Sequence, residues 1–206
     1  MSYNSYRPSQ SATPVVLNLI IINAIVFVAQ LVFDKTGGET GWLTNKLALY
    51  SYDTGLFKPY QLVTHMFAHG GFFHILFNMY ALWIFGSVLE KSWGPKRFLI
   101  FYFVCGLAAG FSQMFFVSQG AAIGASGAVM GLLAAFAYTF PNVQFYILPI
   151  PFPIKAKYLA AIYAAIDIFG GFSGGDNVAH FAHLGGLIAG FILVILWNKT
   201  DKRSRY

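Results

Sequence analysis

The feature that most constrains this chain is a series of apolar stretches, each about long enough to cross the roughly 30 Å hydrocarbon layer of a bilayer. There are about six of them, at residues 14–33, 71–89, 98–117, 125–140, 156–172 and 178–197. Lipid offers no partner to backbone N–H and C=O groups, so a stretch of this length must form a helix. Of the 206 residues, 57% are hydrophobic and only 10% are charged, which argues against a soluble domain. The sequence therefore predicts an all-α polytopic membrane protein.

The basic residues indicate how the chain is oriented in the membrane. Most of them gather in alternate connections between the apolar stretches: Arg7, then Lys91, Lys96 and Arg97, then Lys155 and Lys157, then Lys199, Lys202, Arg203 and Arg205. The other three, Lys35, Lys46 and Lys58, lie in the long first external loop, where acidic residues balance them and where loop length lowers their weight. The loops near 118–123 and 173–177 contain none. Because basic residues concentrate on the cytoplasmic side, we predict an even number of spans with both termini cytoplasmic. The net charge of +6 then reflects orientation, and no nucleic-acid partner is expected.

The predicted organisation is a cytoplasmic tail at 1–13, a membrane domain at 14–198 and a basic cytoplasmic tail at 199–206. No small-residue cleavage site accompanies the first apolar stretch, so we expect it to be retained as a helix. Residues 34–70 form a long first external loop. This loop is too apolar and aromatic for a solvated linker, so short helices at the headgroup level are expected in it.

Serine and histidine side chains occur inside these apolar stretches. All five histidines lie at 64–78 and 179–186, and Gly124-Ala125-Ser126-Gly127 lies between the two segments. Polar groups in hydrocarbon are costly and usually functional. Ser126 begins the fourth stretch, where unpaired N–H groups and the positive end of the helix favour a developing negative charge.

Glycine spacing predicts that the fourth and sixth stretches touch. Gly127 and Gly131 form a small-residue face on one helix, and Gly186 and Gly190 share one side of the other with His183. Contact between these faces would bring the serine hydroxyl within hydrogen-bonding reach of the imidazole. Histidine suits the role of a base because it titrates near neutral pH.

The remaining histidines have other expected roles. His74 and Asn78 are four residues apart on the second stretch, so both can donate hydrogen bonds from one face to an oxyanion. His65 and His69 are expected to anchor the loop or lie at the interface. The residues alone leave His180 and His183 open as the base, although the glycine spacing favours His183.

Three motifs follow one another along the chain: His74-Ile75-Leu76-Phe77-Asn78, Gly124-Ala125-Ser126-Gly127 and Ala182-His183-Leu184-Gly185-Gly186-Leu187-Ile188-Ala189-Gly190. Their order and spacing resemble those of the rhomboid intramembrane serine proteases, and the match covers most of the chain. The resemblance implies a six-transmembrane-helix rhomboid-like bundle and a Ser126–His183 dyad without a third carboxylate. It also implies an oxyanion hole formed by Asn78, His74 and the Ser126 amide.

The same resemblance implies an intramembrane serine endopeptidase that needs no metal or cofactor. Its partners would be the bilayer and single-span membrane-protein substrates, cut in or near the transmembrane segment close to the external face. Glu90 matches a structural acid of the family. Two departures concern loop anchoring and base orientation: Tyr60-Gln61 replaces a frequent Trp-Arg, and Met130 replaces a frequent aromatic residue.

Other classes fit the sequence less well. A zinc protease would use His-Glu-x-x-His, whereas His180 and His183 are three apart with no glutamate between them. An aspartyl protease needs two buried acids, and only Asp167 lies well inside a span. Either Asp167 or Asp176 could supply the carboxylate of a catalytic triad. We instead expect Asp167 to form a hydrogen bond between helices and Asp176 to lie in a solvated turn.

Two non-enzyme alternatives stay open, a rhomboid-like binder of membrane clients that does not cut and a transporter with a histidine relay. The relay leaves Ser126 and Asn78 unexplained. A bacterial plasma membrane is the simplest predicted location, and the oligomeric state is left open.

Overall fold

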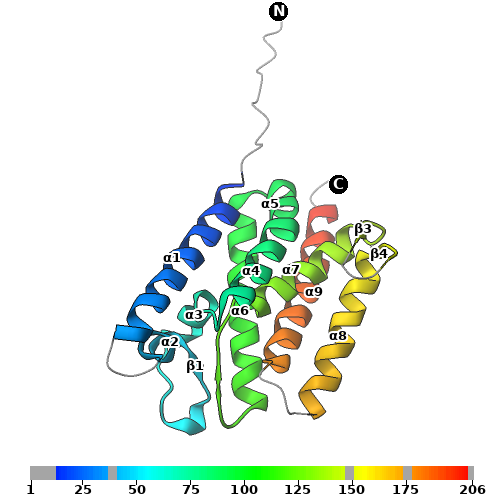
Figure 1. Ribbon diagram of the computed structural model, residues 1–206. Helices are drawn as coiled ribbons and strands as arrows, with labels where there is room; N and C mark the ends of the chain where they lie inside the picture. Colours follow the sequence, from blue (N-terminus) through cyan, green and yellow to red (C-terminus); the bar gives the residue numbers. More distant parts are fainter. Residues whose placement is uncertain (1–12, 37–40, 147–150, 174–177, 204–206) are drawn as a thin grey trace, which may run out of the picture.

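The computed structural model describes residues 13–36, 41–146, 151–173 and 178–203. Its membrane helices are α1 (Pro14–Thr36), the broken helix α4 (Phe72–Ala81), η3 (Leu82–Gly86) and α5 (Ser87–Trp93), then α6 (Pro95–Phe116), α7 (Ser126–Thr139), α8 (Ala156–Ser173) and α9 (His180–Arg203). These helices form a bundle, with the start of α1 and the end of α9 at the same end (Figure 1). The predicted all-α fold is confirmed. α9 continues past residue 198 into the predicted basic tail.

Within the described residues, 4 helices are long and apolar enough to cross a membrane by themselves: Pro14–Lys35, Phe72–Trp93, Pro95–Phe116 and His180–Thr200. α8 does not belong to this set, and α7 has only 14 residues, about 21 Å at 1.5 Å per residue. The count of six spans therefore stays a prediction, although the shared end of α1 and α9 agrees with an even number of passes.

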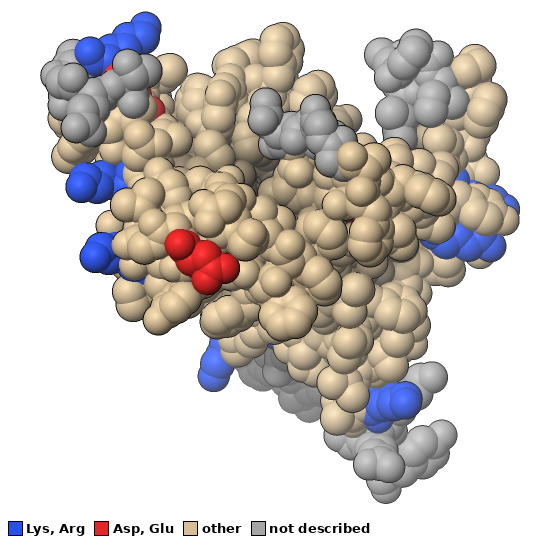
Figure 2. Space-filling model, turned by 90° about the horizontal axis from the view of Figure 1, so that it is seen from below, with Lys and Arg blue, Asp and Glu red and all other residues tan. Residues whose placement is uncertain are grey.

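The outer faces of the helices carry large apolar side chains that have no packing partner in the chain. Ile25 on α1, Phe77 on α4 and Phe169 on α8 are 62%, 64% and 75% exposed. A view onto the end of the bundle opposite the start of α1 shows a nearly uncharged surface with Lys and Arg mainly at its edge (Figure 2). So much apolar exposure indicates contact with lipid, and the chain is a multi-pass membrane protein.

The glycine faces of α7 and α9 touch, as predicted. A Cβ on Gly186 would lie 1.9 Å from the carbonyl oxygen of Gly127, and one on Gly190 would lie 2.5 Å from that of Gly131. Only glycine permits this approach of two backbones. Cys105 of α6 is fully buried against Gly131, consistent with a packing role.

Glu90 fixes the start of α1 against the end of α5. Its two carboxylate oxygens accept hydrogen bonds from the backbone N–H groups of Val15 and Val16, at 3.0 and 2.9 Å. These are first-turn donors that lack a partner within the helix. Glu90 is 2% exposed, so its role is structural, as expected.

The first external loop is folded and packed beside the bundle. It contains α2 (Trp42–Leu47), β1 (Leu49–Tyr50), η1 (Tyr52–Thr54), α3 (Gln61–Thr64) and η2 (His65–Phe67). β1 pairs antiparallel with β2 (Ala121–Ala122), which lies just before α7. A second short pair, β3 (Gln144–Phe145) with β4 (Ile154–Lys155), lies between α7 and α8. The short helices were expected, but the strand pairs were not.

Polar side chains of α1 hold this loop in place. The Gln30 amide donates to Thr44 Oγ1 at 2.6 Å and accepts from the backbone N–H of His69 at 3.0 Å. The Asp34 carboxylate accepts from the first N–H groups of α2, Leu43 at 2.7 Å and Thr44 at 3.0 Å. Both contacts satisfy backbone groups that would otherwise lack partners.

Gln61, one of the two departures from the family pattern, also anchors the loop. Its side chain is buried, accepts from the Lys58 N–H at 3.0 Å and donates to the Leu56 carbonyl at 3.4 Å. The neighbouring Tyr60 is 51% exposed. In this chain, therefore, a glutamine supplies loop anchoring at this position.

Candidate active site

Ser126 is the first residue of α7, as the sequence predicted. The chain reaches it through β2 and then through Gly124, whose φ of +122° is unfavourable for other residues. The Gly124 N–H donates to the His65 carbonyl at 2.8 Å, so the first loop holds the residues before the serine. No side chain caps the start of α7. The N–H groups of its first turn, that of Ser126 included, therefore lack partners within the helix.

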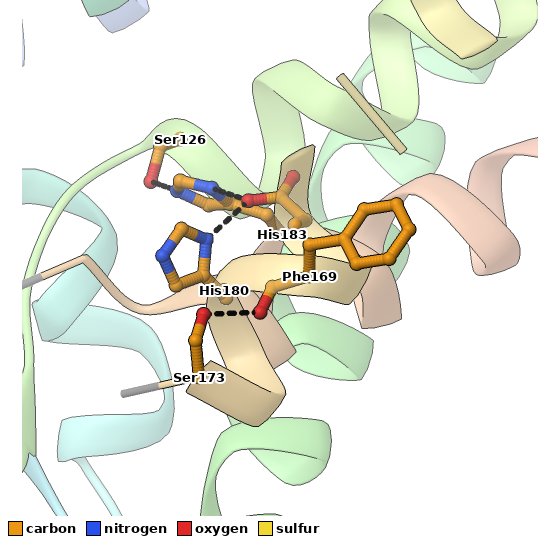
Figure 3. Close-up of polar contacts among 6 residues, drawn as sticks. Ser126, Phe169, Ser173, His180 and His183 are labelled. Atoms are coloured by element: carbon orange, nitrogen blue, oxygen red, sulfur yellow. Dashed lines mark hydrogen bonds and ion pairs between the residues drawn. The ribbon is translucent and has the colours of Figure 1, made fainter. Parts of the chain in front are cut away.

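The predicted serine–histidine contact is present. Ser126 Oγ lies 2.8 Å from His183 Nε2, across 57 residues of sequence. Figure 3 shows the His183 ring beside the Ser126 hydroxyl. The distance is short enough for direct proton transfer from the hydroxyl to the ring.

A carboxylate lies on the other side of the His183 ring. Asp167 Oδ1 of α8 is 3.0 Å from His183 Nδ1 and 2.8 Å from His180 Nδ1. The expectation that no third carboxylate accompanies the base is therefore wrong for the geometry of this chain. Asp167 faces α9, and two histidines of that helix, His180 and His183, both form hydrogen bonds with its Oδ1 atom. Asp176, the other acid considered, lies outside the described residues.

These contacts assign the protons on the His183 ring. A carboxylate only accepts hydrogen bonds, so Nδ1 must carry the proton, and Nε2 is left to accept from the Ser126 O–H. This is the tautomer that a general base requires. Met130, the second departure from the family pattern, is partly buried against the hydrophobic core. The hydrogen bond that orients the ring in this structure comes from a carboxylate.

His74 faces the same region from α4. Its Nδ1 accepts from the Gly70 N–H at 3.2 Å, so Nε2 carries the proton. A Cβ placed on Gly124 would lie 2.7 Å from His74 Nε2 and 3.6 Å from Ser126 Oγ. The His74 N–H therefore lies close to the position where an oxyanion would form next to the serine.

Asn78 lies one turn further along α4, on the face predicted. Its Nδ2 donates to the His74 carbonyl at 2.9 Å, and the side chain is 6% exposed. Among the described residues it forms no hydrogen bond with Ser126 or His183. The amide nitrogen has a second hydrogen to donate.

His65 and His69 are buried in the first loop, in agreement with an anchoring role. His65 Nδ1 donates to the Gln61 carbonyl at 2.8 Å, and His69 is tied to Gln30 through its backbone. Burial lowers the pKa of His65. Burial, with a smaller effect of the nearby His74, lowers the pKa of His69 from 6.5 to about 4.

The depressed pKa of His69 predicts that acid loosens the first loop. Between pH 6.5 and about 4 the unfolded chain binds a proton that the folded loop does not, so stability falls as the pH falls through this window. At about 1.4 kcal/mol per pKa unit, the full effect is at most about 3.5 kcal/mol. Hydrogen exchange of residues 61–69 should accelerate at pH 4.5 relative to pH 7 beyond the intrinsic change. His69→Phe should flatten this dependence, and an unchanged dependence in the variant would contradict the assignment.

In the described part of the chain, one group of residues could hold a metal ion: Asp167, His180 and His183. Their possible ligand atoms all lie within 4.8 Å of one another. Each Nδ1 is here bonded to the carboxylate. Two cavities lie in this region, and His180 lines the larger of them. One, of about 10 Å³, lies beside Ser126, and the other, of about 460 Å³, is lined by His180, Gln113 and Gln119.

Comparisons with known proteins agree with this geometry. The chain is 31% identical over 158 residues to RHOMBOID-like protein 6, mitochondrial, of Arabidopsis thaliana, covering 72% of this chain and 50% of that protein. It is 32% identical over 133 residues to the Rhomboid protease GluP of Bacillus subtilis, covering 64% and 25%. It is 30% identical over 155 residues to Presenilin-associated rhomboid-like protein A, mitochondrial, of Danio rerio, covering 70% and 40%.

The chain thus spans half or less of the length of these three relatives. Two of them are named as mitochondrial and one comes from a bacterium, so the bacterial plasma membrane stays a prediction for this chain. A sequence profile of the Rhomboid domain matches residues 57–199, which include all three motifs and the whole Ser126–His183 contact. The chain belongs to the rhomboid family.

Proposed function

We propose that this chain is a serine endopeptidase that cleaves single-span membrane proteins in or near their transmembrane segments. The observation that carries the proposal is the 2.8 Å contact between Ser126 Oγ and His183 Nε2, within a bundle that presents apolar side chains to lipid. A serine hydroxyl is a weak nucleophile at neutral pH and needs an adjacent base. The contact supplies one at a helix start whose free N–H groups favour negative charge.

The proposed reaction has two steps. As Ser126 Oγ attacks the peptide carbonyl, its proton passes to His183 Nε2, and His183 then gives it to the leaving amine. Water, activated by the same ring, releases the acyl group. The cleft of about 10 Å³ beside Ser126 has space for about one water molecule.

The oxyanion needs donors that are already in position. We assign this role to the Ser126 N–H, His74 Nε2–H and the Asn78 amide. His74 is supported by its proton placement and its position beside Gly124. Asn78 lies on the same face of α4 and has a free amide hydrogen. Losing one such donor typically slows an enzyme by about 10²- to 10³-fold.

The position of Ser126 within the bundle also bears on the substrate. A peptide bond inside an intact helix has its carbonyl engaged in a hydrogen bond, so a substrate must unwind before its carbonyl can be attacked. We therefore expect glycine or other helix-destabilising residues near the cleavage position. A substrate carrying such residues near its external end is the appropriate probe.

The direct test is cleavage and labelling by the purified chain in vesicles. Wild type should cut a tagged single-span substrate with glycines near its external end, and a fluorophosphonate should label Ser126. Ser126→Ala should do neither, and EDTA should leave wild-type cleavage unchanged. Labelling without cleavage of this substrate would call for a panel of substrates. If no substrate is cut and no label is taken up, the chain is a non-cutting binder of membrane clients. Cleavage unchanged by Ser126→Ala would exclude the serine mechanism.

A further inference from the structure

The carboxylate of Asp167 has an unusual environment. The residue is 2% exposed, whereas its neighbours Ile166 and Ile168 on the same helix are about half exposed. Its Oδ1 is shared by two imidazoles, while its Oδ2 is buried without a hydrogen-bond partner among the described residues. A buried charge is costly unless it is compensated. Here the hydrogen bonds that compensate the carboxylate charge are both made to Oδ1, the oxygen that faces the histidines of α9.

We propose that Asp167 is a positioning residue for the His183 base, and that His180 holds the Asp167 carboxylate in place. The inference rests on the proposed function, because it concerns the proton that Ser126 must lose. It adds a third group, on α8, to the serine and histidine contributed by α7 and α9.

The proton balance of the reaction explains why a carboxylate is useful at this position. In the resting state His183 Nδ1–H donates to Asp167 Oδ1, and Nε2 accepts from Ser126. When the serine proton moves to Nε2, the ring becomes an imidazolium with both nitrogens protonated. The Asp167 carboxylate then lies 3.0 Å from the nitrogen that shares the new positive charge. The charge returns to neutral when Nε2 gives its proton to the leaving amine.

His180 has a position suited to fixing the carboxylate. It donates to the same oxygen at 2.8 Å and lines the cavity of about 460 Å³, whereas Asp167 does not line that cavity. His180 therefore stands between the carboxylate and the cavity. Gly170 of α8 permits this arrangement, because a Cβ there would lie 2.3 Å from His180 Nε2. This close approach keeps α8 near the base.

A purely structural role for Asp167 makes different predictions. A helix-contact residue would affect folding, and its loss would slow the residual reaction of a variant without His183 by the same factor as it slows wild type. A positioning residue acts through His183, so its effect should disappear once His183 is absent. It should also determine which nitrogen of His183 carries the proton.

The first test needs no substitution. Nitrogen-15 NMR of histidine-labelled wild type, with assignment by comparison with His183→Ala, should show His183 protonated at Nδ1 and unprotonated at Nε2 at neutral pH. The Nε2–H tautomer would overturn the proposal. Because this readout does not require a substrate, it is independent of whether the chain is found to cleave one.

The second test is kinetic. Asp167→Asn should lower kcat by at least about 10²-fold, and as much as about 10⁴-fold, because an amide can stabilise the wrong tautomer. KM should be little changed. In the His183→Ala background, Asp167→Asn should have no further effect. His180→Asn should give a smaller loss of kcat and keep the Nδ1–H tautomer.

Ser173→Ala is the matched control on α8, since among the described residues its hydroxyl bonds only to the Phe169 carbonyl of its own helix. It should behave as wild type. An unchanged kcat in Asp167→Asn, or an equal loss with and without His183, would overturn the proposal. If Asp167→Asn does not fold, the NMR measurement on wild type decides the matter.

Discussion

Ser126→Ala should lower kcat by about 10⁶-fold, and adding His183→Ala should lower it no further. The reason is that the two side chains act as one unit through the 2.8 Å contact between Oγ and Nε2. Without the hydroxyl there is no proton for the base to accept, and without the base the hydroxyl stays a weak nucleophile. Single-turnover cleavage by each single variant and by the double variant measures this coupling.

Ser92→Ala provides a control for the loss of a serine hydroxyl. Ser92 is exposed on α5 and, within the part of the chain that the structure describes, bonds only to the Val88 carbonyl of the same helix, so this variant should cleave at the wild-type rate. If the double variant is slower than either single variant by the product of their factors, the two residues act independently. The dyad would then be the wrong description.

The second large effect is expected from Gly186→Val, which should lose both activity and stability. Even the first added carbon would lie 1.9 Å from the Gly127 carbonyl oxygen, well inside van der Waals contact. α7 and α9 would have to move apart by more than about 1 Å, and displacements of that size can cost about 10²-fold in rate. Overpacking a tight contact also costs about 1–3 kcal/mol or more of stability.

Cleavage rate and melting temperature in the same detergent test this prediction together. Gly71→Ala is a matched control, because a Cβ at Gly71 would meet no atom within 4 Å. Its rate and melting temperature should equal those of wild type. A Gly186→Val variant that keeps both properties would show that the two helices do not need their close contact.

Much of the architecture could be read from the sequence because the membrane restricts the options. The apolar stretches predicted at 125–140 and 156–172 correspond to α7 (Ser126–Thr139) and α8 (Ala156–Ser173). Helices are the structures that satisfy their own backbone in lipid, so length and hydropathy determine their bounds closely. The serine–histidine contact was predictable for a similar reason, since glycine faces identify which helices approach.

Other features of the fold and of the site depend on contacts between distant residues, and such contacts produce no recognisable pattern in the local sequence. β1 and β2 have two residues each, too few for an alternation of polar and apolar side chains to appear. Asp167 is a single acid in an apolar helix, and only the packing of α8 against α9 shows that it meets the base. Likewise, the anchoring by Gln61 depends on how the loop folds back.

The order of the catalytic groups along the chain also affects how the protein is made. In the proposed enzyme the nucleophile belongs to α7, whereas His180 and His183 are in the first turn of α9, the last helix that the structure describes. During synthesis the serine therefore enters the membrane well before His183, the base that activates it. A nascent chain is thus inert toward its neighbours at the site of insertion, and competence to cut arises only when the final helix joins the bundle.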